Sequence, residues 1–224
     1  MASFQELLYP LGFISTFFFG LRTLSQWGVS EVKKRSSVPK IFWHFSLAGN
    51  LSLLLHSLIQ LQYHVSIVQA INAIISIRNL DLLKGTHQRL SLKSTLFLGF
   101  ANLLLVSLYF NFQTLWFEGD PKWFRSPFSP LNFNDGFLFY IWHGFGVLGL
   151  FLFNSRFWYQ WWRSEKNRIS TLDKTFWQIS FIGSFFCLFY FLTQLDVVNA
   201  IGPVGNLIPI LRNLMLIKKE ERVS

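Results

Sequence analysis

Charge is scarce in this 224-residue chain: Asp, Glu, Lys and Arg together make up only 14% of it. About a quarter of an average soluble globular protein is charged, so this chain lacks the surface that a soluble core requires. Hydrophobic residues account for 51%, aromatic residues for 19%, and the mean hydropathy is +0.36. The composition excludes a disordered chain and predicts an all-α polytopic membrane protein.

Cysteine is scarcer still. The only cysteine, Cys187, lies in an apolar run without a second cysteine, which excludes a disulfide-stabilised secreted module and a zinc site built on cysteines. No Ser-His-Asp set, phosphate-binding glycine loop or dinucleotide fingerprint occurs. Five histidines lack metal-ligand spacing and are interpreted as interfacial or packed residues: His44, His56, His64, His87 and His143. We therefore expect no catalytic residue, metal site or cofactor.

Long hydrophobic runs take up most of the chain. Each is close to the length of about 20 residues that crosses a hydrocarbon core as a helix. We predict seven transmembrane helices, at roughly 7–27, 41–60, 64–82, 95–116, 136–158, 175–194 and 197–216.

The basic residues that give the net charge of +9 separate these runs and do not gather on one soluble face, which argues against nucleic acid as a partner. With alternating loops, fourteen Lys and Arg fall on one side of the membrane and two, Lys122 and Arg125, on the other. Cytoplasmic loops carry the excess of positive charge, so the N-terminus is predicted outside and the C-terminus in the cytoplasm.

The chain also contains an internal repeat. Shifting it by 134 residues aligns 19–83 with 153–217 without a gap, with 23 identities in 65 positions. Two three-helix units in the same orientation need one extra crossing between them. We therefore predict a SWEET-like 3+1+3 arrangement of parallel triple-helix bundles: repeat one in 1–83, a linker helix with its loops in 84–135, and repeat two with a basic tail in 136–224.

The repeat matches polar residues inside hydrophobic segments. Arginine is rare there because its burial costs a few kcal/mol or more, so matched arginines require an internal partner or an anionic ligand. We predict a phosphate-binding set formed by Arg22, Gln26, Arg78, Asn79, Arg156, Gln160, Arg212 and Asn213. The alternative is that the arginines extend to lipid headgroups or pair with Glu31, Glu165 or Asp81.

Four further matched residues are predicted to line a pocket. Asn72 and Asn206 lie mid-span, where each amide must bond a neighbouring helix or a solute. Gly202, Pro203, Gly205 and Pro209 around Asn206 predict an interrupted helix. Trp43 and Trp177 either join this pocket or belong to an interfacial aromatic belt. Gly49 and Gly183 are expected to permit close helix approach.

The run Phe19-Gly-Leu-Arg-Thr-Leu-Ser-Gln-Trp-Gly-Val-Ser-Glu31, followed by Ser36-Ser-Val-Pro-Lys-Ile-Phe-Trp43 and Arg78-Asn-Leu80, resembles the lipid A biosynthesis N-terminal domain. The second copy departs from it with Asp173 at the position of Pro39. The family is similar in architecture to SWEET and PQ-loop transporters, although the Pro-Gln dipeptide is absent here. In some bacteria the domain precedes lipid-A-disaccharide synthase, the glycosyltransferase that joins UDP-2,3-diacylglucosamine to 2,3-diacylglucosamine 1-phosphate.

The resemblance implies a role in lipid A assembly at the cytoplasmic face of a Gram-negative inner membrane. We expect the chain to bind or present a phosphorylated acyl-glucosamine lipid to a separate glycosyltransferase. Because the chain stops eight residues after Leu216, without a soluble nucleotide-sugar domain, we expect it not to catalyse the transfer alone. A SWEET-like facilitator for sugar or another small solute, bound near Asn72 and Asn206, is the alternative.

Overall fold

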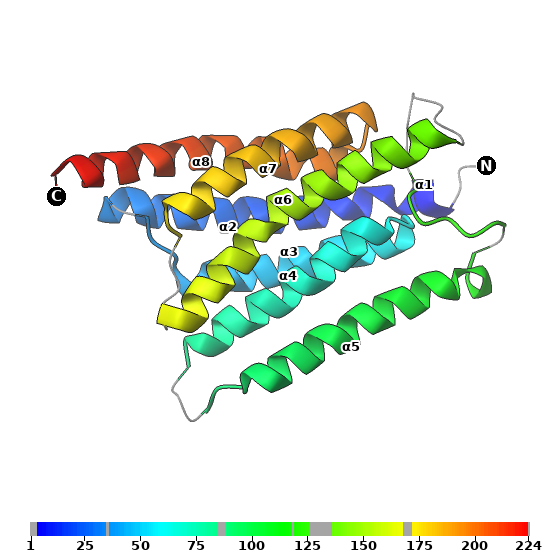
Figure 1. Ribbon diagram of the computed structural model, residues 1–224, viewed down its shortest axis with the longest axis horizontal. Coiled ribbons are helices and arrows are strands. Elements are labelled where there is room, and N and C mark those ends of the chain that lie inside the picture. Colours follow the sequence, from blue (N-terminus) through cyan, green and yellow to red (C-terminus); the bar gives the residue numbers. More distant parts are fainter. Residues whose placement is uncertain are drawn as a thin grey trace.

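A computed structural model describes residues 4–34, 36–84, 88–117, 119–125, 136–167 and 172–223. His87, one of the five histidines considered above, lies outside these ranges. Within them the chain is helical, and its long helices run roughly side by side along one axis (Figure 1). All seven predicted segments are helices, which confirms the all-α prediction.

The helical elements follow the predicted segments in order. The first combines α1 (Phe4–Leu8), the 3-10 turn η1 (Tyr9–Leu11) and α2 (Gly12–Lys33). The others are α3 (Lys40–Ile59), α4 (Tyr63–Leu82), α5 (Leu92–Asn111), α6 (Phe137–Asn167), α7 (Lys174–Thr193) and α8 (Val197–Val223). Helices α2, α6 and α8 extend past the predicted hydrophobic boundaries, because their last turns continue into polar and charged sequence.

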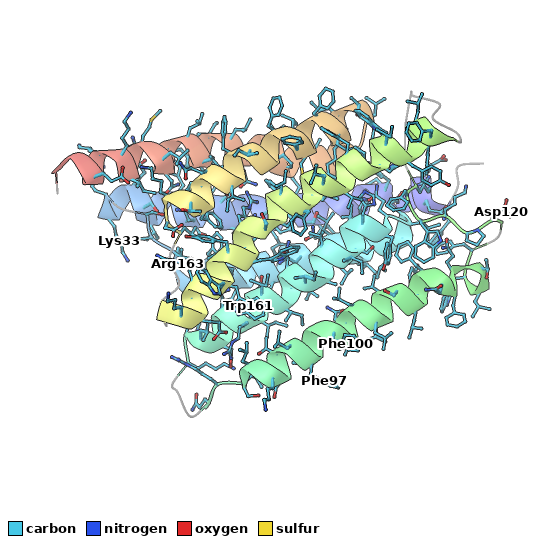
Figure 2. All side chains as sticks on the ribbon, in the orientation of Figure 1. Lys33, Phe97, Phe100, Asp120, Trp161 and Arg163 are labelled. Carbon is cyan, nitrogen blue, oxygen red and sulfur yellow. The ribbon has the colours of Figure 1, made fainter. Side chains whose placement is uncertain are left out.

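Six of these helices have the length and apolar composition of a membrane span. Helix α3 has 20 residues but is not among the six, since His44, Asn50 and His56 lower its hydropathy. Large apolar side chains also face outward: Phe97 and Phe100 on α5 are 70% and 67% exposed (Figure 2). Together these features identify a multi-pass membrane protein, whose apolar surface faces lipid.

The second helices of the two repeats begin at matched positions with different caps. Pro39 precedes α3 with an extended backbone, whereas Asp173 precedes α7 and accepts a hydrogen bond from the amide of Phe176 at 3.0 Å. A fixed proline φ and a capping carboxylate are alternative ways to start a helix. The departure at position 173 therefore preserves the helix start.

The turns after these helices have the same backbone conformation. Leu61 and Leu195 adopt left-handed φ angles of 55° and 50°. The amide of Gln62 donates to Ser57 O at 2.9 Å, and the amide of Asp196 donates to Phe191 O at 3.0 Å. Non-glycine residues seldom adopt this conformation, so its recurrence 134 residues later is a specific structural likeness between the two halves.

Two three-helix groups, α2–α3–α4 and α6–α7–α8, contact each other through α2 with α8 and α4 with α6, while α5 packs beside α4 at the edge (Figure 1). Helix α8 is continuous through Pro203 and Pro209. The predicted interruption is therefore wrong, since α8 accommodates both prolines without ending. Lys33 and Arg163 lie at one end, called the basic end below, and Asp120 lies at the opposite end (Figure 2).

Candidate functional site

The predicted polar residues form three layers, which run inward from the basic end. The outermost contains two ion pairs that link the halves. Arg78 on α4 donates through Nε and Nη2 to both carboxylate oxygens of Glu165 on α6, at 2.5 and 3.1 Å. Arg212 on α8 donates in the same way to Glu31 on α2, with an Nη2–Oε2 distance of 2.9 Å. We call these two pairs the latches.

The latches differ in burial. Arg78 is 3% exposed and also donates to Asp81 at 2.9 Å and to the carbonyl of Leu90 at 2.7 Å. Arg212 is 40% exposed, and Glu31 is 28% exposed. The alternative interpretation of these two arginines, pairing with acids, is thus the arrangement that the structure contains. The α4–α6 latch is the more firmly held.

The second layer contains two amide pairs between the halves. Gln26 Nε2 donates to Asn213 Oδ1 at 3.1 Å, and Gln160 Nε2 donates to Asn79 Oδ1 at 2.9 Å. Each glutamine also donates to a serine one turn later, Gln26 to Ser30 and Gln160 to Ser164. All four amide side chains are almost completely buried. Buried amides of this kind rigidify a contact when their bonds are satisfied.

The third layer contains Arg22 and Arg156, which are 6% and 3% exposed. Neither guanidinium group has a hydrogen-bond acceptor or an acidic partner within the described residues, and Arg156 Nε is buried without a partner. Burial excludes the interpretation that these two arginines extend to headgroups. The glutamates nine residues further along the same helices, Glu31 and Glu165, are engaged by the latches. Two buried cations without counter-ions are unfavourable unless an anion joins them.

Aromatic rings take the place of anions around these arginines. Arg22 Cζ lies 4.7 Å from the centre of the Phe19 ring, and Arg156 Cζ lies 3.7 Å from that of Phe153, the matched residue. Both guanidinium groups also lie against the Phe157 ring, at 5.3 and 4.8 Å. Cation–π contacts offset part of the desolvation cost but leave the guanidinium donors unsatisfied.

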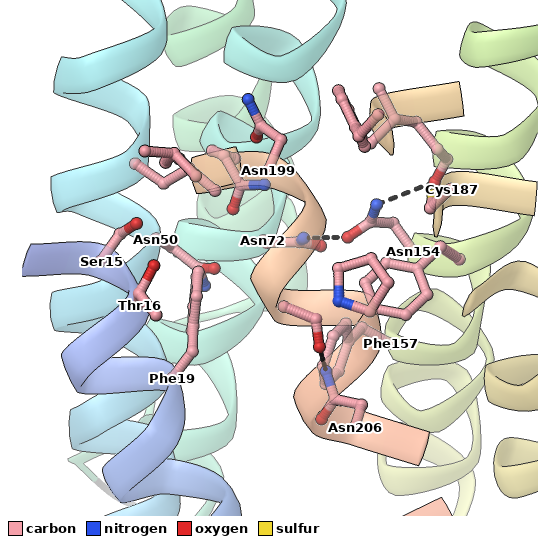
Figure 3. Close-up of a pocket in the computed structure, with 18 of the residues that line it drawn as sticks. Ser15, Thr16, Phe19, Asn50, Asn72, Asn154, Phe157, Cys187, Asn199 and Asn206 are labelled. Atoms are coloured by element: carbon pink, nitrogen blue, oxygen red, sulfur yellow. Dashed lines mark hydrogen bonds between the residues drawn. The ribbon is translucent and has the colours of Figure 1, made fainter. Parts of the chain in front are cut away.

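A cavity of about 60 Å3 lies between the two halves beside these arginines. Asn72 Nδ2 donates to Asn154 Oδ1 at 2.6 Å, while Asn72 Oδ1 has no partner (Figure 3). Asn206 Oδ1 accepts from Thr23 Oγ1 at 3.3 Å. The lining also contains Cys187. Asn72 thus bonds a neighbouring helix through its nitrogen, while its buried oxygen is left without a partner among the described residues.

The paired tryptophans divide into two groups. Trp43 and Trp177 are 1% and 6% exposed and pack in a core cluster, so their interpretation as an interfacial belt is wrong. They border small voids beside the arginines, so their place in a ligand pocket stays a prediction. Trp27 and Trp161 are half-buried and donate through Nε1 to Glu31 and Glu165 at 3.2 and 3.0 Å. They therefore orient the latch carboxylates.

A further network closes the opposite end. Asp196 is 1% exposed and accepts from Tyr9 Oη at 3.0 Å, Gln62 Nε2 at 2.6 Å and Asn199 Nδ2 at 2.8 Å. Gln62 and Asp196 are matched by the 134-residue shift, so equivalent positions of the halves meet here. The search for identical pairs overlooked this contact because the two residues differ. Asn154 was overlooked for the same reason, since its counterpart is Gly20.

Asp196→Asn is expected to lower the free energy of unfolding by about 1–3 kcal/mol. Both carboxylate oxygens accept from donors, so either orientation of the new amide points an N–H group at another donor. Thermal unfolding of the purified protein in mild detergent measures the loss. Asp173→Asn is the control, because asparagine also caps helices and should change stability little. Equal stability of the Asp196 variant and the wild type would contradict this account.

Comparison with known proteins gives a consistent family assignment. The model of the lipid A biosynthesis N-terminal domain matches residues 11–81 and again residues 145–215. The chain is 38% identical to the lipid-A-disaccharide synthase of Chlamydia abortus over 98% of this chain and 34% of the relative. The corresponding enzymes of Chlamydia felis and Chlamydia pneumoniae are 37% and 33% identical, over 97% and 96% of this chain and 34% of each relative.

The chain thus spans about a third of the length of the curated relatives that it matches. No solved structure matches the chain significantly. The two segments that match the family model are offset by the same 134 residues as the internal repeat, and together they contain all twelve predicted site residues.

Proposed function

The chain belongs to the lipid A biosynthesis N-terminal domain family, and on that premise we propose that it binds a phosphorylated acyl-glucosamine lipid and presents it to a glycosyltransferase. Its membership and its relatives associate it with lipid A biosynthesis. The partner enzyme that we propose is lipid-A-disaccharide synthase, the activity named for the relatives.

One observation carries the ligand assignment: Arg22 and Arg156 are buried beside a common cavity without an acidic partner in the described chain. A phosphate monoester supplies the charge and acceptor oxygens that two guanidinium groups require. The latches engage Arg78 and Arg212 with glutamates. Arg22 and Arg156 are therefore the arginines that we propose to hold the phosphate, with the amide pairs above them.

The proposed topology follows from charge. The basic end would face the cytoplasm, with the N-terminus outside, in the inner membrane of a Gram-negative cell. Seven crossings in a duplicated 3+1+3 arrangement, divided at 83/84 and 135/136, remain our proposal for the architecture. The matched turns at Leu61 and Leu195 and the twofold family match support the duplication.

We further propose that this chain does not transfer the sugar itself. Its described residues form a helical bundle, and we assign no catalytic residue among them. Purified chain mixed with UDP-2,3-diacylglucosamine and 2,3-diacylglucosamine 1-phosphate should therefore yield no disaccharide. Disaccharide formation by the chain alone would contradict the proposal.

Mass spectrometry of lipids that copurify in mild detergent tests the binding role. Wild-type protein from a host that makes lipid A should retain phosphorylated acyl-glucosamine, and Arg22→Ala/Arg156→Ala should lose most of it. The control Arg163→Ala/Lys174→Ala also removes two positive charges at the basic end but lies outside the cavity, and it should retain the lipid.

If the wild type and the arginine variant carry only the same ordinary phospholipids, the lipid-binding proposal fails. The asparagine-lined cavity would then favour the solute facilitator as the better interpretation.

A further inference from the structure

The cavity beside Arg22 and Arg156 is too small for a whole glycolipid headgroup. Its volume of about 60 Å3 is room for only a few water molecules. Binding sites for complete small molecules usually enclose about 300 Å3 or more. In this conformation the site therefore accommodates a group no larger than a small oxyanion, and an anion attached to anything larger requires the bundle to open.

The latches lie on the helix pairs through which the two halves touch. Glu31–Arg212 links α2 to α8, and Arg78–Glu165 links α4 to α6. In both halves the latch glutamate lies nine residues after the cavity arginine on the same helix, which is about 13 Å along the axis. The amide pairs lie between them. Access from the basic end is thus closed first by carboxylates and then by amides.

We propose that the latches control entry of a phosphate monoester anion to Arg22 and Arg156, and that the Glu31–Arg212 latch opens first. This inference rests on the proposed function, since it takes the anion site as given and adds how the site is reached. Phosphate and carboxylate oxygens both accept the paired N–H groups of a guanidinium. An arriving phosphate therefore displaces Glu31 from Arg212 without leaving that arginine unpaired.

Differences in burial and partners determine the order of opening. Arg212 and Glu31 are half-buried, and among the described residues Arg212 pairs with no acid besides Glu31. Arg78 is buried and keeps Asp81 and the Leu90 carbonyl when Glu165 is removed. Exposed pairs dissociate more readily than buried ones, which leave unsatisfied groups behind. The α2–α8 side consequently separates while the α4–α6 side holds the halves together.

The inward path supplies partners at each step. After the Glu31–Arg212 latch has opened, the anion meets the N–H groups of Gln26 and Asn213 on the α2–α8 side. These two side chains bond each other in the closed structure. It then reaches Arg22, which lies one helical turn before Gln26. Five of the eight residues predicted from the sequence as one phosphate-binding set thus act in succession: Arg212 first, then Gln26 and Asn213, and finally Arg22 and Arg156.

The single cysteine provides a direct readout of opening. Cys187 is completely buried and lines the cavity. Its modification by a water-soluble maleimide, in the purified full chain, therefore reports access to the site. Glu31→Gln removes the latch charge and should raise the modification rate about fivefold, the change expected for loss of a partly exposed ion pair. Lys174→Ala, which breaks the exposed Lys174–Glu221 pair at the same end, should leave the rate unchanged.

Exchanging the two charges of the Glu31–Arg212 latch distinguishes loss of the ion pair from general destabilisation of the protein. Glu31→Arg/Arg212→Glu restores an ion pair with reversed sense and should return the rate toward the wild-type value, which a generally destabilised variant would not do. Glu165→Gln should raise the rate less than Glu31→Gln. If Glu31→Gln labels at the wild-type rate, or if the exchange variant labels as fast as Glu31→Gln, the latch proposal is overturned.

Ligand protection tests the anion site separately. Inorganic phosphate and glucosamine 1-phosphate are the two probes, and each should slow Cys187 modification in the wild type but not in Arg22→Ala/Arg156→Ala. Protection by both indicates recognition of the phosphate itself, and protection by the sugar phosphate alone indicates recognition of the headgroup. Protection without an effect of Glu31→Gln overturns the latch and supports the anion site. If Glu31→Gln speeds labelling but neither probe protects Cys187, the latch does not control an anion site, and that part of the proposal is overturned.

Discussion

Arg22→Leu/Arg156→Leu is expected to raise the thermal stability of the protein in phosphate-free detergent. Each arginine is buried among phenylalanine rings without an acceptor in the described chain. Replacing even a buried ion pair by apolar side chains of similar volume is often neutral or stabilising by about 1–4 kcal/mol, and these two arginines have no ion pair among the described residues to lose. Because leucine also packs against the surrounding rings, we expect a gain in this range for the double variant.

The same variant should lose its response to phosphate. A ligand that binds only the folded state at 100 times its Kd stabilises that state by about 2.7 kcal/mol. Wild-type protein should therefore melt at a higher temperature as inorganic phosphate is added, whereas the leucine variant should melt at a constant temperature. Thermal unfolding in mild detergent over a phosphate series, at fixed ionic strength, measures both effects.

Arg78→Leu is the matched control, since it removes an equally buried arginine that has acidic partners. This substitution removes the guanidinium group that pairs with Glu165 and Asp81, and it should lower the free energy of unfolding by about 3–5 kcal/mol. If Arg22→Leu/Arg156→Leu raises the free energy of unfolding and Arg78→Leu lowers it, the two substitutions distinguish ligand-binding arginines from a structural one. A leucine variant of Arg22 and Arg156 that melts below the wild type would mean that these arginines stabilise the bundle, and the energetic argument for a bound anion would fail.

Gly183→Ala is expected to destabilise the bundle by about 3 kcal/mol, at the upper end of ordinary overpacking. A Cβ at this position would lie 2.4 Å from Phe153 Cα and 2.5 Å from Phe153 N. These are backbone atoms of α6, so the clash is relieved only if α6 and α7 move apart. That movement would also shift Phe153, whose ring lies against Arg156.

The repeat supplies the control for this substitution. At Gly49, the matched position, a Cβ would meet the ring of Phe19 at 2.5 Å and no backbone atom among its nearest contacts. A side chain can turn aside, so Gly49→Ala should cost less than Gly183→Ala. Gly20→Ala meets nothing within 4 Å and should be neutral or stabilising by about 1 kcal/mol. Equal melting temperatures for the Gly49 and Gly183 variants would contradict this account.

The sequence was sufficient to predict the helices. Their positions follow from the length of each hydrophobic run, which is a local property of the chain. The repeat made Arg22 and Arg156, or Gln26 and Gln160, visible as pairs. All twelve predicted residues lie in the three layers or line the adjacent pockets.

The sequence did not decide which residue each polar group would contact. Arg78 bonds Glu165, 87 residues away, and Arg212 bonds Glu31, 181 residues away. The sequence alignment matches identical residues of the two copies. The structure instead brings unlike residues of the two halves into contact: arginine with glutamate, and glutamine with asparagine. Position-by-position comparison of the copies could not reveal contacts between different positions.

The length of each hydrophobic run is a property of that run alone, so the sequence by itself determined a helical membrane protein, and its internal similarity identified the matched polar residues. The packing of the two halves decided the remainder: that Arg78 and Arg212 are neutralised by glutamates, that Trp43 and Trp177 are buried, and that Arg22 and Arg156 are left without counter-ions. The reason is physical, because the stability of a buried charge depends on what distant helices bring within hydrogen-bonding distance of it.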